Sequence, residues 1–221
     1  MAVVKFDYDG YGQVELNNVA FRRDGRIEAQ CALDEAFTTE APAENGMLLA
    51  VDKANRLIKL PTATETLPIA LHYSTEHLYD ERTPGLKSFK LTRSDGTYSM
   101  KNAKDAPYPR MGYLAVGDLF TTNTVCFNDA ETGFTAVAAV TDDPSTTDVD
   151  ETVAAQTKYE HFLETLKNGY KETTYYGGID TSGRIKVTAT AAPTYGPTLK
   201  VVDVYTMPDG TPGFKFQVIK A

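Results

Sequence analysis

The feature that most constrains the fold is a repeated local pattern, in which two short apolar runs flank a turn that in four of five cases contains Asp and Gly. Glycine accepts positive φ at little cost and aspartate bonds to nearby backbone, so such turns join antiparallel strands. The runs alternate apolar and polar residues, which is typical of half-buried strands. The pattern predicts five hairpins. Their strand pairs, each with its turn in parentheses, are 14–21 and 26–32 (24–25), 47–51 and 56–60 (53–55), 86–93 and 97–101 (94–96), 173–179 and 184–191 (180–183), and 199–207 and 214–219 (208–213).

Further segments complete this β pattern. Residues 68–73, 111–116, 124–127 and 134–140 are predicted to be strands, and the acidic, Pro-containing residues 34–46 a surface loop.

One segment departs from the β pattern and predicts a helix. Asp148 and Glu151 have the spacing of a capping box. Apolar residues then recur along one helix face at Ala155, Tyr159, Phe162 and Leu166.

The sequence therefore predicts a mainly β fold of antiparallel, hairpin-rich sheets, sandwich or barrel-like, with one α-helix at about 149–168. Residues 141–150, TDDPSTTDVD, have the composition of a linker. We therefore expect a β-rich main domain over 1–140, a linker over 141–150, and a helix plus a second β-rich domain over 151–221.

Composition and charge narrow the classes of partner. The net charge is −8 and the basic residues are scattered, which argues against direct contact with nucleic acid. No apolar run approaches the ~20 residues of a membrane span, so no membrane partner is predicted. The first ten residues lack the pattern of a signal peptide, so a cytoplasmic protein is expected. Cys31 and Cys126 are interpreted as reduced, partly buried thiols.

The candidate metal ligands are weak. His72 and His77 lie five positions apart and fall on opposite faces of a strand, whereas zinc needs three or four convergent ligands. We therefore interpret both as exposed polar residues near a loop. Asp7, Asp9 and Gly10 resemble the start of a calcium loop, but the glycine falls at the fourth loop position and not the sixth. A solvated turn is the default there, and calcium remains the alternative.

Other candidates carry no clear chemistry either. A second acidic cluster is interpreted as a solvated linker with a helix cap, and His161 lies within the predicted helix and borders the core. The motifs of hydrolases, phosphate loops and dinucleotide sites are absent from the sequence. We predict no catalytic, cofactor-binding or metal-binding residue and no enzymatic activity, although paired carboxylates of a glycosidase would escape such inspection. The acidic cluster consists of Asp142, Asp143, Asp148 and Asp150.

The densest local order lies in Pro107–Asn128, PYPRMGYLAVGDLFTTNTVCFN. We interpret it as two strands joined through Gly117 and Asp118 after a proline-rigid loop. Thr121, Thr122 and Asn123 are predicted to shape a backbone turn. Among its charged residues, Arg110 is the one expected to have a fixed partner.

This stretch carries a resemblance to a known class of proteins. YPRMGYLAVGDLFTTNTV is similar to a recurring PR-x-G-x-L-x-x-GD-x-FTTN phrase in structural proteins of tailed bacteriophages, and residues 1–34 and 44–61 resemble head and capsid-associated proteins of the same phages. The resemblance covers residues 1–140. The matching residues are Pro109, Arg110, Gly112, Leu114, Gly117, Asp118, Phe120, Thr121, Thr122 and Asn123.

The resemblance implies a phage virion structural protein, namely a capsid decoration or minor head protein that binds and stabilises the shell. Its implied partners are the major capsid protein or other virion proteins and further copies of itself, in a virion assembled in the host cytoplasm. The alternative in the same setting is a tail or baseplate protein whose C-terminal region binds the host surface or carbohydrate. A cell-wall or polysaccharide hydrolase is the third hypothesis.

Overall fold

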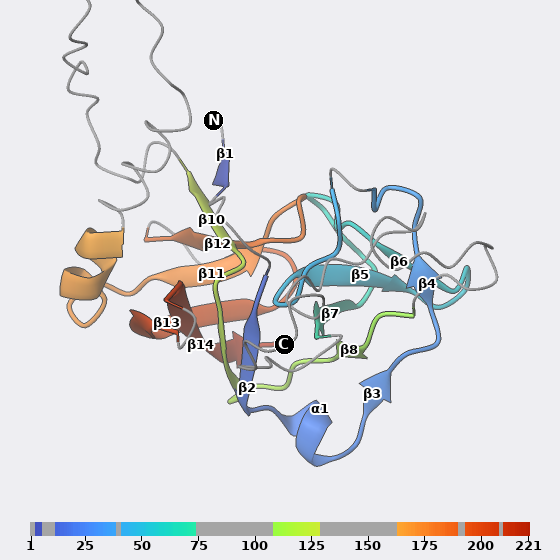
Figure 1. The fold of residues 1–221 in the computed structure, drawn as a ribbon, viewed down its shortest axis with the longest axis horizontal. Coiled ribbons are helices and arrows are strands. Elements are labelled where there is room, and N and C mark those ends of the chain that lie inside the picture. Colours follow the sequence, from blue (N-terminus) through green and yellow to red (C-terminus); the bar gives the residue numbers. More distant parts are fainter. Residues whose placement is uncertain are drawn as a thin grey trace, which may run out of the picture.

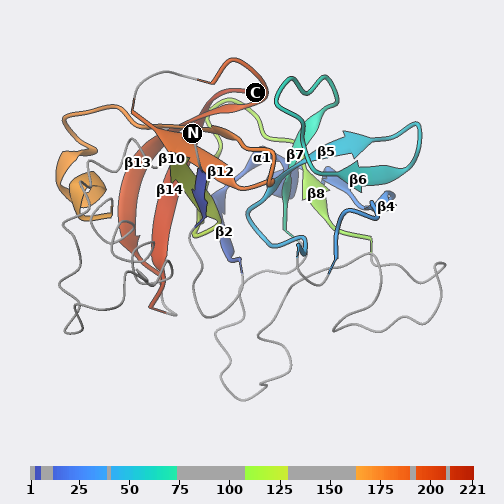
Figure 2. The same cartoon turned by 90° about the horizontal axis from the view of Figure 1, so that it is seen from above.

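The protein is built from two packed β-sheets, which lie side by side in both views of the computed structural model (Figures 1 and 2). The structure describes residues 3–5, 12–38, 41–73, 108–128, 163–189, 193–207 and 210–221. Most of the ordered elements are strands, so the predicted mainly β fold class is confirmed.

The first sheet has eight strands. All its pairings are antiparallel except that of β10 with β12, which is parallel. In order across the sheet, the strands are β1 (Val3–Lys5), β10 (Val125–Asn128), β12 (Ile185–Thr188), β11 (Tyr176–Ile179), β13 (Thr198–Thr206), β14 (Pro212–Lys220), β9 (Leu119–Thr122) and β2 (Val14–Asn18).

The second sheet has six strands, of which only β4 and β6 pair in parallel. It is formed by the segments between β2 and β9, so the chain leaves the first sheet, builds the second and returns. In order, its strands are β3 (Ile27–Glu28), β8 (Met111–Gly112), β7 (Ile69–His72), β5 (Leu48–Asp52), β6 (Leu57–Lys59) and β4 (Ala32–Leu33).

Chain connectivity forces the first sheet to curl. Only Asn123 and Thr124 separate Thr122, which ends β9, from Val125, which begins β10. Three residue steps reach at most about 11 Å. The two strands stand five spacings apart in the sheet order, which would be about 24 Å in a flat sheet. The sheet therefore bends until β9 and β10 meet at residues 122–124, which we call the corner, and combines sandwich packing with a barrel-like curl.

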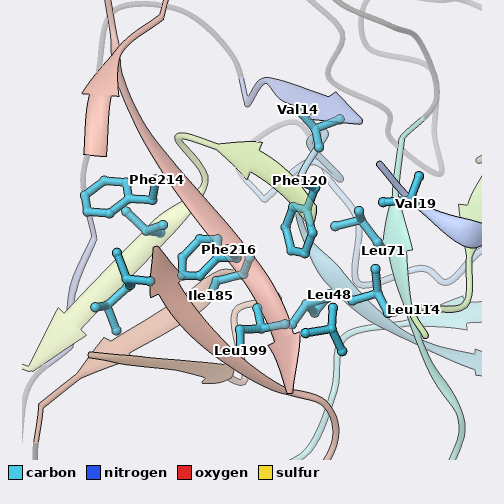
Figure 3. Packing of buried hydrophobic residues seen from close by; sticks show 14 of the residues in the cluster. Val14, Val19, Leu48, Leu71, Leu114, Phe120, Ile185, Leu199, Phe214 and Phe216 are labelled. Carbon is cyan, nitrogen blue, oxygen red and sulfur yellow. The ribbon is translucent and has the colours of Figure 1, made fainter. Parts of the chain in front are cut away.

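The concave side of this curl holds the main hydrophobic core. Phe120 of β9 and Phe214 and Phe216 of β14 are fully buried, and the rings of Phe120 and Phe216 lie 5.7 Å apart. Leu48 and Leu71 of the second sheet belong to the same cluster, so the two sheets share one interior (Figure 3). Burial of large side chains of this kind is the main stabilising contribution to such a fold.

At its central strand β5, the second sheet is buried on both faces. All five residues of β5 are buried, and they alternate between two clusters, with Leu48 in the main core and Leu49 and Val51 in a second one. The second cluster includes Phe37 and Ala43, which cover the outer face. The prediction that residues 34–46 form a surface loop is therefore wrong for its apolar members, because they close the far side of this sheet.

Three predicted hairpins are confirmed. The pairs β5–β6, β11–β12 and β13–β14 are antiparallel neighbours joined at the predicted turns, and β7 occurs within the predicted strand 68–73. The predicted hairpin at 86–101 and the strand at 134–140 lie outside the described residues.

The first predicted hairpin is wrong. Residues 14–18 form β2, but the strand expected around Phe21 is the four-residue helix α1 (Ala20–Arg23). β2 pairs with β9 in the first sheet and β3 with β8 in the second, so they are not partners. The Asp24–Gly25 pair ends α1 instead of joining two strands, since Asp24 N donates to Ala20 O at 2.8 Å.

The stretch Pro107–Asn128 also departs from prediction. The expected strand 111–116 is reduced to β8, and the next strand, β9, includes Thr121 and Thr122, which were predicted to form a turn. The two predicted strands are not a pair, because β8 belongs to the second sheet and β10 to the first. This stretch instead carries the chain from one sheet to the other.

The predicted helix is described only over 163–169, where it is helical, and the rest of 149–168 lies outside the described residues. Leu166 is fully buried in the main core, as the apolar stripe predicted. The segments 1–140 and 151–221 each supply four strands to the first sheet, so the boundary between the two sheets does not follow the predicted domain division. The linker 141–150 also lies outside the described residues.

Truncating the shared core should cost far more than truncating the surface of the same strand. We expect Phe216→Ala to lower the free energy of unfolding by about 3–5 kcal/mol, because it leaves a cavity between the sheets. Ile219→Ala, on the exposed end of β14, should cost only about 0.5 kcal/mol. Urea unfolding of both variants checks this, and equal losses would contradict the assigned core.

Candidate functional site

The corner is fully buried, and its polar side chains bond to backbone from distant segments. Thr122 Oγ1 donates to Gln13 O at 2.6 Å, and Asn123 Oδ1 accepts from Gln13 N at 2.8 Å. Thr124 Oγ1 donates to Asn45 O at 2.6 Å. Buried backbone groups need partners, so these side chains replace the ladder bonds that a bent chain cannot make.

Two glycines let neighbouring backbone approach the corner. Gly46 has a φ of 88°, and a Cβ there would lie 1.9 Å from Thr122 Oγ1. A Cβ on Gly12 would lie 2.6 Å from Thr124 Oγ1. Any larger residue would push these segments off the corner, so both positions require glycine for space, and Gly46 also for its conformation.

A buried ion pair lies beside the corner. Glu44 Oε2 accepts from Gly12 N at 2.6 Å, and Glu44 Oε1 lies 3.8 Å from Arg184 Nη2. Both charged side chains are less than a tenth exposed. A buried charge is tolerated only when it is paired and hydrogen-bonded. The pair therefore joins the loop before β5 to the turn before β12.

His72 completes this group and contradicts its predicted exposure. Its side chain is fully buried, and Nδ1 donates to Glu44 O at 2.8 Å. Burial lowers the pKa of His72 to about 4, so the ring is neutral at neutral pH. We call the corner and the residues around it the polar junction. Besides the corner, it consists of Gly12, Gln13, Glu44, Asn45, Gly46, His72 and Arg184.

The polar junction is suited to holding segments together. Its carboxylate is engaged by a backbone amide and a guanidinium, and its imidazole donates to a carbonyl. It connects β2 and the corner, in the first sheet, with the loop before β5 and with β7, in the second. Its chemistry is therefore that of a structural clamp between the two sheets.

Asp118 is a second buried carboxylate with a positioning role. Its Oδ1 accepts from Ala20 N at 2.9 Å, which caps α1, and its Oδ2 accepts from Ala115 N at 2.8 Å. The predicted turn at Gly117 is confirmed by a φ of 94°. Asp118 thus has the fixed partners that were expected of Arg110, whose exposed side chain makes no ion pair with the rest of the described chain.

The outer face of the first sheet carries a polar network. Tyr205 Oη bonds to Glu15 and lies 3.0 Å from Thr121 Oγ1, which donates to Asn17 Oδ1 at 2.8 Å. The tyrosine crosses β14 to reach β9 and β2, and its cross-strand partner is Gly213, which has no side chain. Burial and the bond to Glu15 raise the pKa of Tyr205, so it remains a protonated donor.

The other candidate ligands are not brought together in the described ranges. His77, Asp7, Asp9, Gly10 and His161 lie outside them, as does the acidic cluster at 142–150. Within the described ranges, no group of three His, Cys, Asp or Glu residues could hold a metal ion. None of the helices described there is long and apolar enough to cross a membrane. Cys31 and Cys126 are both buried and unbridged, as interpreted from the sequence.

Sequence reasoning missed the polar junction. Glu44 and Asn45 were placed in a solvent-exposed loop, and Arg184 was given no role, because their partners in the junction lie 28 or more residues away along the chain. The Asn45–Gly46 pair was the one local signal, since such pairs mark positive φ. That signal predicts a turn and says nothing about what packs against it.

Comparisons with protein-family models, with curated proteins and with solved structures found no match to this chain. Its function is therefore argued from its own residues.

Adding a methyl group at Gly46 should open the polar junction. Gly46→Ala places a side chain on a residue with positive φ and brings its Cβ into the Thr122 hydroxyl. We therefore expect a loss of about 3–5 kcal/mol in the free energy of unfolding. Gly117→Ala is the matched control, because its φ is also positive while nothing lies within 4 Å of the added Cβ. It should cost only about 1–2 kcal/mol. Chemical unfolding checks the difference, and similar losses would rule out close packing at Gly46.

The buried His72 should make the protein less stable in mild acid. Its folded pKa of about 4 lies below the unfolded value of 6.5, so between these values the unfolded chain binds the additional proton. The free energy of unfolding should therefore fall as pH drops from 6.5 towards 4, with a slope approaching about 1.4 kcal/mol per pH unit from this group. Urea titrations of wild type and His72→Gln measure it, and an unchanged slope in the variant would contradict the assignment.

Proposed function

We propose that this chain is a structural protein of a tailed-bacteriophage virion, acting as an auxiliary head protein that binds the capsid shell and stabilises it. Binding only to the assembled shell stabilises that shell by mass action. Such a protein needs a rigid framework and a contact surface of about 1,000 Å² or more in total.

The observation that carries the proposal is the structural role of the phage-like phrase. Gly117 supplies a positive-φ turn, Asp118 caps α1, and Asn123 accepts from the backbone of Gln13 just before β2. Phe120 lies at the centre of the core. The residues of the phage-like phrase therefore fix a turn, the start of α1 and part of the core, which supports a framework role for the phrase more than a catalytic one.

Exposed apolar side chains offer contact surface at the end of β14. Val116 is 68% exposed and Ile219 is 41% exposed. They are neighbours, because Gly117 N donates to Val218 O at 2.8 Å. We call Val116 and Ile219 the β14 patch. Apolar groups left in water at one place are typical of protein contact sites, so this patch supports a role in binding.

The tail or baseplate alternative requires the C-terminal residues to act as a separate host-binding module. Strands β11, β13 and β14 instead lie between β12 and β9 in a sheet shared with the N-terminal strands. No observation on the described residues favours that alternative over a head protein.

The proposal is tested on particles of the phage that encodes the chain. We expect mass spectrometry and cryo-electron microscopy of purified virions to find the protein on the head. Shells stripped of the protein should rebind it. Absence from the particle, or its location on the tail alone, would overturn the proposal.

The same rebinding assay tests the contact surface. Val116→Ser combined with Ile219→Ser should weaken shell binding about tenfold or more, because hot-spot apolar contacts are each worth over 1 kcal/mol. Tyr195→Ser, another exposed apolar position at 46%, serves as the control and should bind as wild type does. Equal binding by all three proteins would assign the contact to a different face.

A further inference from the structure

Nearly all the net negative charge of the chain lies in one segment. Residues 129–162 contain eight acidic residues and one lysine, a net charge of −7, whereas the whole chain carries −8. The other 187 residues are therefore close to neutral, with a net charge of −1. A segment of 34 residues so charged is expected either to remain in solvent or to pair with a basic surface.

A basic surface exists on the outer face of the first sheet. Lys186 of β12, Lys200 of β13 and Lys215 of β14 are half-buried there, and no ion pair joins any of them to another described residue. We call these three residues the lysine face. Tyr176 of β11 stands directly opposite Lys200, which places an aromatic ring among them.

The one described acid directly opposite this face is already engaged. Asp203 pairs in register with Lys215, but its Oδ1 accepts from Val204 N at 2.9 Å and from Tyr170 Oη at 3.3 Å. Asp203 is therefore a neighbour of Lys215, but no ion pair joins the two side chains, and Lys186 and Lys200 have no acid as a described cross-strand partner. Unpaired ammonium groups on one face favour an anionic partner.

The acidic segment begins after a strand next to the lysine face and ends at a helix whose next residue contacts β13. It follows β10, which pairs with β12, the strand of Lys186. It ends at the helical residues 163–169, after which Tyr170 bonds to Asp203 of β13. β10 and β13 stand three strand spacings apart, about 14 Å, and a chain of 34 residues reaches well over that distance.

We propose that the acidic segment 129–162 docks on the lysine face of its own chain. Charge complementarity, length and the position of both ends support this occupant. The other long segment outside the described residues, 74–107, has six basic and five acidic residues, so it lacks the charge to compete. This inference is independent of the proposed virion function. If the acidic segment occupies the lysine face, an acidic partner from another molecule has to displace that segment before it can bind there.

Zero-length carbodiimide cross-linking tests the contact, because it joins a lysine directly to a carboxylate. We expect mass spectrometry to find Lys186, Lys200 or Lys215 joined to acids of 129–162, and these links to disappear in about 1 M salt, where the Debye length is about 3 Å. A mixture of ¹⁴N- and ¹⁵N-labelled protein distinguishes the two sources of the segment. Links of one isotope only support docking within the chain, whereas mixed links, or no links, overturn it.

Hydrogen exchange gives an independent readout. In the triple variant that combines Lys186→Gln, Lys200→Gln and Lys215→Gln, amides of 129–162 should exchange about tenfold faster than in wild type. The increase is limited because each lysine–carboxylate pair contributes only modestly to docking. The matched control removes the same charge from exposed positions elsewhere, with Arg23→Gln, Arg26→Gln and Arg56→Gln. It should exchange as wild type does. Equal exchange in the lysine variant and wild type, or equal acceleration in both variants, would overturn the proposal.

Discussion

The corner at residues 122–124 is the constraint on which the rest of the structure depends. Two residues carry the chain between strands that stand five spacings apart, so the first sheet has to curl. That curl creates the concave side on which Phe120 and Phe216 meet the second sheet. A sharp bend interrupts the backbone ladder, and the side chains of Thr122, Asn123 and Thr124 replace the lost bonds.

The polar junction lies in an apolar interior, so every polar group in it needs a partner. Each bond is worth only about 1 kcal/mol net, but leaving one buried group unpaired costs about 1–3 kcal/mol. Glu44, Arg184 and His72 are therefore tolerated only in one arrangement of the two sheets. The junction thus selects the relative position of the sheets, while the hydrophobic core supplies most of the stability.

Prediction from sequence succeeded where the interactions are local. The β5–β6, β11–β12 and β13–β14 hairpins were found because their turns and alternation lie within a short stretch. It failed at α1, since the buried Phe21 fits a strand and a short helix equally well and the capping carboxylate of Asp118 lies 98 residues away. It failed again at residues 34–46, because Phe37 is buried by a sheet that no local pattern reveals.

The sequence by itself determined the fold class, the tight turns, and the concentration of acidic charge in residues 129–162. These properties follow from composition, from backbone conformational preferences and from period-two patterns, all of which act over a few residues. Only the tertiary structure decided which strands pair, that His72 is neutral and buried, and that three lysines share one face. The reason is that pairing, burial and charge clustering depend on contacts between distant segments, and the corner brings those segments together.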